Sequence, residues 1–358
     1  MKNEDVLLRI DADIKQATAA IDRLKTGFKG FGKDVETETK QLKQRLDGIM
    51  RSVAVGFAAA STAIGVGLGK SIQNAAHFEQ AMRNVNSIAK DSESTFARIT
   101  ESVLRMGSVA DLAEGPSSLA SALYDINSAG FKSEAGLKVL ETSSKAATAG
   151  LTETSTAAKG IVVALNSYGK GANEAGRLAD ILFQTVEEGI ITFPTLSDNI
   201  GKVTAVASAG GVSMEELGAA MAQLTAKGLS AEEAAVALRG AILKMLAPTE
   251  AQKKAAAEYG ITLGEAALKQ QGFAGLLADI NTKTRGSKEA LFDVIGEVRA
   301  FNGALKLIGD DGGASFINRI ERFENSSGAL GRALAQQEKA LSTQFKKLAA
   351  AVETSAVR

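Results

Sequence analysis

The sequence has 358 residues, of which 45% are hydrophobic and 23% charged, as in folded proteins with more than one structural unit. Its 41 basic and 41 acidic side chains balance, so the chain as a whole has no electrostatic preference for nucleic acid. The absence of cysteine excludes disulfides, thiolate nucleophiles and cysteine metal sites, and is typical of proteins made in a reducing cytoplasm.

The first predicted unit, residues 1–50, combines a short strand with a heptad helix. Residues 6–10 are predicted to be extended, and the first ten residues are too charged for a signal peptide. From residue 14, apolar side chains recur with the spacing of a coiled-coil seam. The seam consists of Ile14, Ile21, Leu24, Phe28, Phe31, Val35, Leu42 and Ile49. Because Glu38 and Arg45 interrupt the seam, both self-association and packing on the same chain remain open.

The second predicted unit, residues 51–70, is a helix rich in alanine and glycine. Residues 52–69 carry no charge and lie between Arg51 and Lys70. The segment is slightly shorter than the roughly 20 apolar residues that span a membrane. Gly65 and Gly69 form a GxxxG pair, which lets two helices approach closely. A buried or self-associating helix and a membrane-active helix are the two interpretations.

The third predicted unit, residues 71–327, is a core of short helices. Its three prolines, Pro116, Pro194 and Pro248, each stand beside Ser or Thr just before a helical pattern resumes. Four residue pairs have capping-box spacing: Ser213 with Glu216, Ser230 with Glu233, Thr249 with Gln252, and Thr262 with Glu265. The preceding glycines, Gly211, Gly228 and Gly260, are predicted helix C-terminal caps.

A weak internal repeat runs through this core. Ser128, Ala129 and Gly130, followed by Ser133 and Leu137, recur eighty residues later as Ser208, Ala209 and Gly210, followed by Ser213 and Leu217. The turn at residues 150–152 has a similar counterpart at residues 228–230. A duplication of a helix–turn–helix unit and a coincidence of cap chemistry both explain the pattern.

The last predicted unit, residues 328–358, is an amphipathic helix that carries Leu334, Leu341, Phe345 and Leu348. It has no C-terminal cap, so either its end frays or it continues in a longer protein. Taken together, the units predict an all-α protein: an extended N-terminal coiled-coil-like helix followed by a core of short packed helices.

No residue is assigned to catalysis, to a cofactor or to a metal. His77 is the single histidine, which excludes a histidine-based triad or a multi-histidine metal site. Glu187 and Glu188 diverge by about 100° on a helix and do not form one paired-carboxylate site. Two further motifs lack the spacing of a calcium loop or a dinucleotide-binding loop. These are the polar turn Asp310, Asp311, Gly312 and Gly313, and the glycine-rich segment at residues 65–69.

A series of motifs runs through the middle of the chain. It opens at Phe78, Glu79, Met82 and Val85, with the pattern FE-x-x-M-x-x-V, and continues in order at residues 119–131, 175–180, 209–217, 238–248 and 259–261. The opening pattern and the order of these segments resemble the core region of phage tail tape measure proteins. The resemblance covers residues 70–325 or so, whereas typical members are much longer. A fully helical chain of this length would reach roughly 540 Å, which suits a short tail or a fragment.

The resemblance implies a structural role without catalysis. Several copies would form a helical bundle in the lumen of the tail tube, where they would set tail length and leave with or ahead of the DNA. The implied partners are the chain itself, the tail tube protein, tail assembly chaperones, tail tip proteins and the host membrane. The implied locations are the virion and, during assembly, the host cytoplasm. A membrane-active or pore-forming helical protein is the alternative function, and a cell-wall hydrolase is a third.

Overall fold

The computed structural model of the protein describes residues 63–108, 114–325 and 327–337. Within these ranges the chain forms sixteen α-helices and one 3-10 helix, and no residue lies in a strand. The all-α prediction is therefore confirmed. The predicted strand at residues 6–10 and the heptad helix at residues 14–49 lie outside the described residues.

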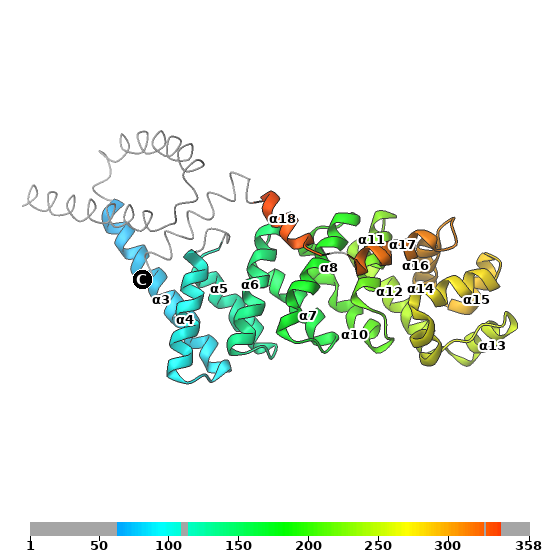
Figure 1. Cartoon of the computed structure of the whole chain (residues 1–358), viewed down its shortest axis with the longest axis horizontal. Coiled ribbons are helices and arrows are strands. Elements are labelled where there is room, and N and C mark those ends of the chain that lie inside the picture. Colours follow the sequence, from blue (N-terminus) through cyan, green and yellow to red (C-terminus); the bar gives the residue numbers. More distant parts are fainter. Residues whose placement is uncertain (1–62, 109–113, 326, 338–358) are drawn as a thin grey trace, which may run out of the picture. The chain divides into compact units, whose positions relative to one another are not determined.

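The helices follow one another with short connections (Figure 1). The first are α3 (Ala63–Ala89), α4 (Glu93–Ser108), α5 (Pro116–Ser128), α6 (Ser133–Gly150), α7 (Thr154–Ser167), the 3-10 helix η2 (Ala172–Glu174), α8 (Ala175–Glu188), α9 (Phe193–Asn199) and α10 (Gly201–Ala209). The others are α11 (Met214–Ala226), α12 (Ala231–Leu246), α13 (Glu250–Glu258), α14 (Glu265–Lys283), α15 (Lys288–Ile295), α16 (Val298–Ile308), α17 (Ala314–Glu324) and α18 (Ala329–Gln337).

By its internal contacts the chain divides into two units, Met1–Asn74 and Ala75–Arg358. Of the first unit, the structure describes the beginning of α3. Among the residues that the structure describes, none of the helices combines the length and the hydropathy of a membrane span. The uncharged segment at residues 52–69 is described only from Ala63 onward. The predicted domain boundaries remain predictions.

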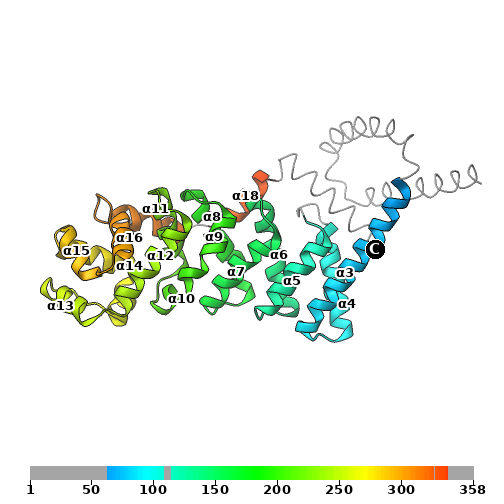
Figure 2. The same cartoon turned by 180° about the vertical axis from the view of Figure 1, so that it is seen from behind.

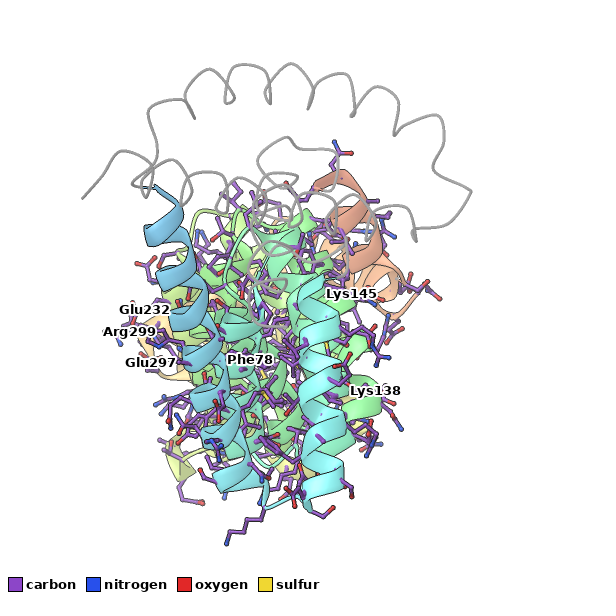
Figure 3. All side chains as sticks on the ribbon, turned by 90° about the vertical axis from the view of Figure 1, so that its left-hand side faces the viewer. Phe78, Lys138, Lys145, Glu232, Glu297 and Arg299 are labelled. Atoms are coloured by element: carbon purple, nitrogen blue, oxygen red, sulfur yellow. The ribbon has the colours of Figure 1, made fainter. Side chains whose placement is uncertain are left out.

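The second unit has one continuous apolar core, to which α3 contributes the segment that opens the family resemblance. Phe78, Met82 and Val85 are all buried, because their spacing of four and three residues places them on one helix face. Figure 3 shows Phe78 inside the unit and Lys138 at its periphery. The spacing in the sequence therefore marks a packing face rather than a chemical site.

Small residues bring the helices of this unit close together. A Cβ atom on Gly303 of α16 would lie 3.0 Å from the Cβ of Ala237 on α12. A Cβ on Gly160 of α7 would lie 2.6 Å from Ser197 Oγ on α9. The high alanine and glycine content thus builds a closely packed core from short helices.

Local cap chemistry explains many of the helix boundaries. The capping boxes of Ser230 with Glu233 and of Thr249 with Gln252 are both complete. Gly211, Gly228 and Gly260 have positive φ angles of 76°, 89° and 67°. After each of them the next amide donates to a carbonyl five residues earlier, for example Ile261 N to Ala256 O at 2.9 Å. The prediction of these helix ends is confirmed.

Two of the four predicted capping boxes are not complete in the structure. Thr262 does not cap α14, which begins at Glu265 after Gly264, a residue with φ 123°. Ser213 does accept the amide of Glu216, but the Glu216 carboxylate lies elsewhere, as described below. Both errors have one cause: the spacing identifies residues able to cap, whereas the tertiary contacts decide which of them do so.

The two copies of the proposed repeat share an order of elements and part of their packing. A helix, a turn and a helix follow one another in both copies, as α5 with α6 and as α10 with α11. In both copies the first helix packs most extensively on the helix two further along the chain, α5 on α7 and α10 on α12. α5 also packs on α6, whereas α10 has few contacts with α11. At the turn after α6, moreover, Leu151 and not Gly150 takes the left-handed conformation.

The last two helices run back over earlier ones. α17 packs on α11, and α18 packs on α6 and α8 (Figures 1 and 2). We call α17 and α18 together the strap. Contacts of the strap link residues about 150 positions apart in the sequence, as between Leu330 and Asp180.

Candidate functional site

The strap is held by one polar face of α8. This helix buries Leu178, Ile181 and Leu182 in the core. Arg177 and Asp180 lie three residues apart, so that they share a face of the helix. Both belong to the segment at residues 175–180 that resembles the tape measure family. In the structure these two polar residues bind the ends of the strap helices.

Arg177 and Asp180 bind the helix termini that meet in the middle of the strap. Arg177 Nη2 donates to the carbonyl oxygens of Phe323 and Glu324, at 2.8 and 3.2 Å, at the C-terminal end of α17. The amides of Gly328 and Leu330, at the N-terminal end of α18, donate to the Asp180 carboxylate at 2.9 and 3.0 Å. A cation at a helix C-terminus and an anion at an N-terminus both complement the helix dipole.

A second group of ionic contacts lies at the end of α8. The Glu188 carboxylate accepts hydrogen bonds from Arg319 Nη1 and Arg322 Nη2, both at 2.6 Å. Burial acts to raise the pKa of Glu188, but hydrogen bonds from Arg322 and Gln184 and the charges of both arginines outweigh it and lower the pKa. The carboxylate is therefore ionised at neutral pH and holds α17 through two arginines.

Glu187 holds the other strap helix through a separate partner. Its carboxylate pairs with Arg332 of α18 at 3.2 Å. Adjacent positions on a helix predict that Glu187 and Glu188 diverge. In the structure the two residues pair with different arginines, on α18 and on α17.

An apolar contact completes the surface beneath the strap. The ring of Phe323 is fully buried against α8 and α11. A Cβ atom on Gly218 of α11 would lie 2.8 Å from Phe323 Cε1 and 3.0 Å from Ile181 Cγ2. Gly218 therefore leaves the space that this ring fills. Phe316 packs edge-to-face on Phe273, with ring centroids 6.3 Å apart.

A buried carboxylate lies in the neighbouring part of the core. Glu216 on α11 is 7% exposed, and its Oε1 accepts the amide of Ala274 at 2.6 Å. This contact caps the second half of α14, which is interrupted at Gly272 with φ 71° and ψ 169°. Burial raises the pKa of Glu216 in spite of its backbone hydrogen bonds. Its role is to satisfy the amides that the kink exposes.

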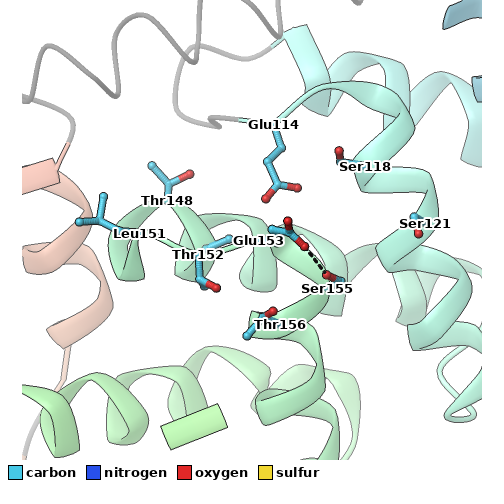
Figure 4. Close-up of a pocket in the computed structure, with 10 residues that line it drawn as sticks. Glu114, Ser118, Ser121, Thr148, Leu151, Thr152, Glu153, Ser155 and Thr156 are labelled. Carbon is cyan, nitrogen blue, oxygen red and sulfur yellow. Dashed lines mark hydrogen bonds between the residues drawn. The ribbon is translucent and has the colours of Figure 1, made fainter. Parts of the chain in front are cut away.

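A surface groove lies away from the strap contacts of α8. It has a volume of about 710 Å³ and is formed by α5, the end of α6 and the start of α7 (Figure 4). Its lining is mostly hydroxyls, with the carboxylates of Glu114 and Glu153, and none of its ten residues is basic. Glu114 accepts the amide of Thr154 at 2.7 Å and so caps α7. Of the hydroxyls in the groove, that of Ser155 donates to the Glu153 carboxylate at 3.5 Å (Figure 4).

Two further candidates from the sequence are His77 and the polar turn at residues 310–313. His77 is exposed on α3. The Asp311 carboxylate accepts the amides of Gly313 and Ser315 at the start of α17, and its bonds to Ser315 lower its pKa. Within the described residues no three acidic or histidine side chains gather as they would around a metal ion.

The α8–strap contacts and the capping role of Glu216 cannot be predicted from the sequence alone. Each joins residues from 58 to 150 positions apart, as in the pairs Glu216–Ala274 and Asp180–Leu330. The only available signal was local: polar residues spaced by three and four along an amphipathic helix. That spacing indicates a polar face, but it does not identify the partner.

Comparison with known proteins adds a family. Residues 100–296 match the family described as "Phage-related minor tail protein". The chain is 28% identical over 318 residues to a "Probable tape measure protein" of Clostridium phage phiCD119. It is 24% identical over 313 residues to a "Tape measure protein" of Pneumococcus phage Dp-1.

Both alignments cover most of this chain but a minor part of each relative. They include 85% of this chain in each case, with 33% of the clostridial phage protein and 26% of the pneumococcal phage protein. The chain thus spans about a third or less of the length of these relatives. No solved structure matches the chain.

Proposed function

Because the chain belongs to the phage-related minor tail protein family, we propose that it is a structural tail protein of the tape measure kind. The observation that carries the proposal is the alignment of 85% of the chain with two proteins named as tape measures. The described residues agree with a structural role, since they form packed helices held by caps, small residues and ion pairs.

In this proposal several copies lie as a helical bundle in the lumen of the tail tube. Tube subunits polymerise around the bundle, with tail assembly chaperones and tail tip proteins as further partners. The length of the extended part of the chain sets the length of the tail. On infection the chain leaves the tube with or ahead of the DNA and meets the host membrane. Assembly takes place in the host cytoplasm.

Tail length in the virion tests this function. We expect deletion of 28 residues, four heptads of residues 14–49, to shorten tails by about 42 Å, at 1.5 Å per helical residue. The measurement is tail length in electron micrographs of phage carrying the shortened gene. In the control no residue is deleted. The same four heptads are replaced by an unrelated heptad sequence of equal length. Tails of unchanged length in the deletion variant would contradict the proposal.

The proposed function includes no catalysis. We expect the purified chain to leave peptidoglycan intact in a zymogram, because a hydrolase needs a carboxylic acid or metal-bound water beside its substrate. The groove of Figure 4 instead presents hydroxyls and two carboxylates, of which Glu114 caps a helix and Glu153 accepts a hydrogen bond from Ser155. A cleared band that disappears on replacing Glu114 or Glu153 with glutamine would show the groove to be an active site.

A further inference from the structure

We propose that the surface of α8 and α11 beneath the strap is a docking site for the strap of a second copy of this chain. The two copies would exchange α17 and α18, each binding the other's helices with the contacts now made within one chain. The proposal concerns a definite surface and a definite occupant, and it does not depend on the tape measure function.

The contacts of the strap are suited to exchange because the polar contacts described above are made to one helix, α8. Arg177, Asp180, Glu187 and Glu188 of α8 bind both strap helices through the hydrogen bonds and ion pairs described above. The apolar contact of Phe323 beside Gly218 likewise involves only the strap and the surface beneath it. A strap from another copy would therefore make the same contacts, so that exchange leaves their free energy almost unchanged.

The connection to the strap has the backbone of a hinge. Between α16 and α17, Gly309, Gly312 and Gly313 have φ angles of 59°, 69° and 102°. Glycine adopts both positive and negative φ at little cost, so this turn can open into an extended link without steric strain. The strap follows all the other described helices, so its release requires no other helix to move.

Concentration decides between the two arrangements. A short flexible link gives the strap an effective concentration of about 1 mM at its own surface, so a free copy at about 10 µM occupies about 1% of the surfaces. Copies held side by side in an assembly reach local concentrations of about 1 mM, which is close to the effective concentration of the strap at its own surface. We therefore expect little exchange in dilute solution and substantial exchange where copies are held together.

Two single-cysteine variants of the full chain test the exchange. The natural chain has no cysteine, so each variant carries one reactive thiol. Glu187→Cys labels α8 and Arg332→Cys labels the strap, at positions whose charged groups lie 3.2 Å apart. The two variants are unfolded and refolded together over a range of protein concentrations, and then treated with a short bis-maleimide. We expect a cross-linked dimer of the two variants that increases with concentration.

A control separates exchange from collision. Replacing Arg332→Cys by Glu258→Cys, an exposed position on α13, should remove the dimer because that residue does not belong to the strap.

A dimer that increases with protein concentration and disappears with Glu258→Cys supports exchange. A chain carrying both cysteines that cross-links only within itself, with no dimer from the mixed variants at any concentration, overturns the proposal. A dimer that forms equally with Glu258→Cys shows random collision and overturns it as well.

Discussion

Leu151 adopts the left-handed conformation, with φ 53° and ψ 43°, at the end of α6. This conformation brings the Cβ of an L-residue close to the following carbonyl and costs about 1 kcal/mol or more. After four other described helices the residue with positive φ is a glycine, namely Gly130, Gly211, Gly228 and Gly260, whereas Lys90 after α3 and Arg285 after α14 resemble Leu151. The Leu151 side chain is 60% exposed, so its burial does not offset this cost.

We therefore expect Leu151→Gly to raise the free energy of unfolding by about 0.5–1 kcal/mol, after allowing for the greater freedom of glycine in the unfolded chain. Leu243 is the control, since it is 42% exposed but lies inside the helix α12. Leu243→Gly should lower the free energy of unfolding by about 1 kcal/mol. Urea denaturation midpoints at constant slope measure both effects. A loss of stability in Leu151→Gly would show that the side chain makes a contact that outweighs the backbone cost.

Glu216 predicts how stability depends on pH. Because burial raises its pKa in the folded state, folding favours the protonated carboxyl. The stabilising effect is complete below the pKa of the unfolded carboxyl, about 4.3, and is lost as the pH rises through the folded-state value. Relative to the natural chain, Glu216→Gln should therefore gain stability between pH 4 and neutrality.

Glu233 provides the opposite control. Hydrogen bonds from Ser230 lower its pKa, so its stabilising effect is present above the unfolded pKa and is lost as the pH falls. Glu233→Gln should lose stability relative to the natural chain as the pH rises over the same range. Thermal melting of both variants across pH 3.5–7 is the measurement. Parallel pH profiles for Glu216→Gln and the natural chain would show that the Glu216 carboxyl titrates normally.

At the scale of helices, α14 shows how a tertiary contact changes a regular pattern. Gly272 has φ 71° and ψ 169°, a region open essentially only to glycine. Gly272→Ala should therefore cost about 1–3 kcal/mol. Gly275→Ala in the same helix should instead be neutral or stabilising by up to about 1 kcal/mol, because its Cβ meets only Gln271 at 3.6 Å. Equal effects of the two substitutions on chemical denaturation would contradict the kink.

Some features of the helices can be predicted from the sequence, and others cannot. Helix ends such as Ser230 and Gly260 depend on bonds across three to five residues, so the local sequence identifies them. The kink at Gly272 requires the Glu216 carboxylate from another helix, and the α8–strap contacts require residues about 130–150 positions away. No local pattern in the sequence identifies these partners. Thr262 has the spacing of a capping box, and yet it does not cap α14.

At the scale of the whole molecule, the apolar core connects distant parts of the second unit. A single cluster of buried side chains extends from Phe78 on α3 to Leu330 on α18. A folded unit of this kind does not add 1.5 Å per residue to a tail, as an extended helix does. In the proposed function, therefore, the heptad helix and the packed core should contribute differently to tail length.

An insertion at two places compares these contributions. The same 28-residue helical segment is inserted in phase within residues 14–49, or in the turn after Lys170, where Gly169 and Gly171 have open space around them. The first insertion should lengthen tails by about 42 Å. The second should leave tail length unchanged, because the added residues form an outward loop on a unit that stays folded. Equal lengthening at both sites, measured by electron microscopy, would mean that the core unfolds into an extended helix inside the tube.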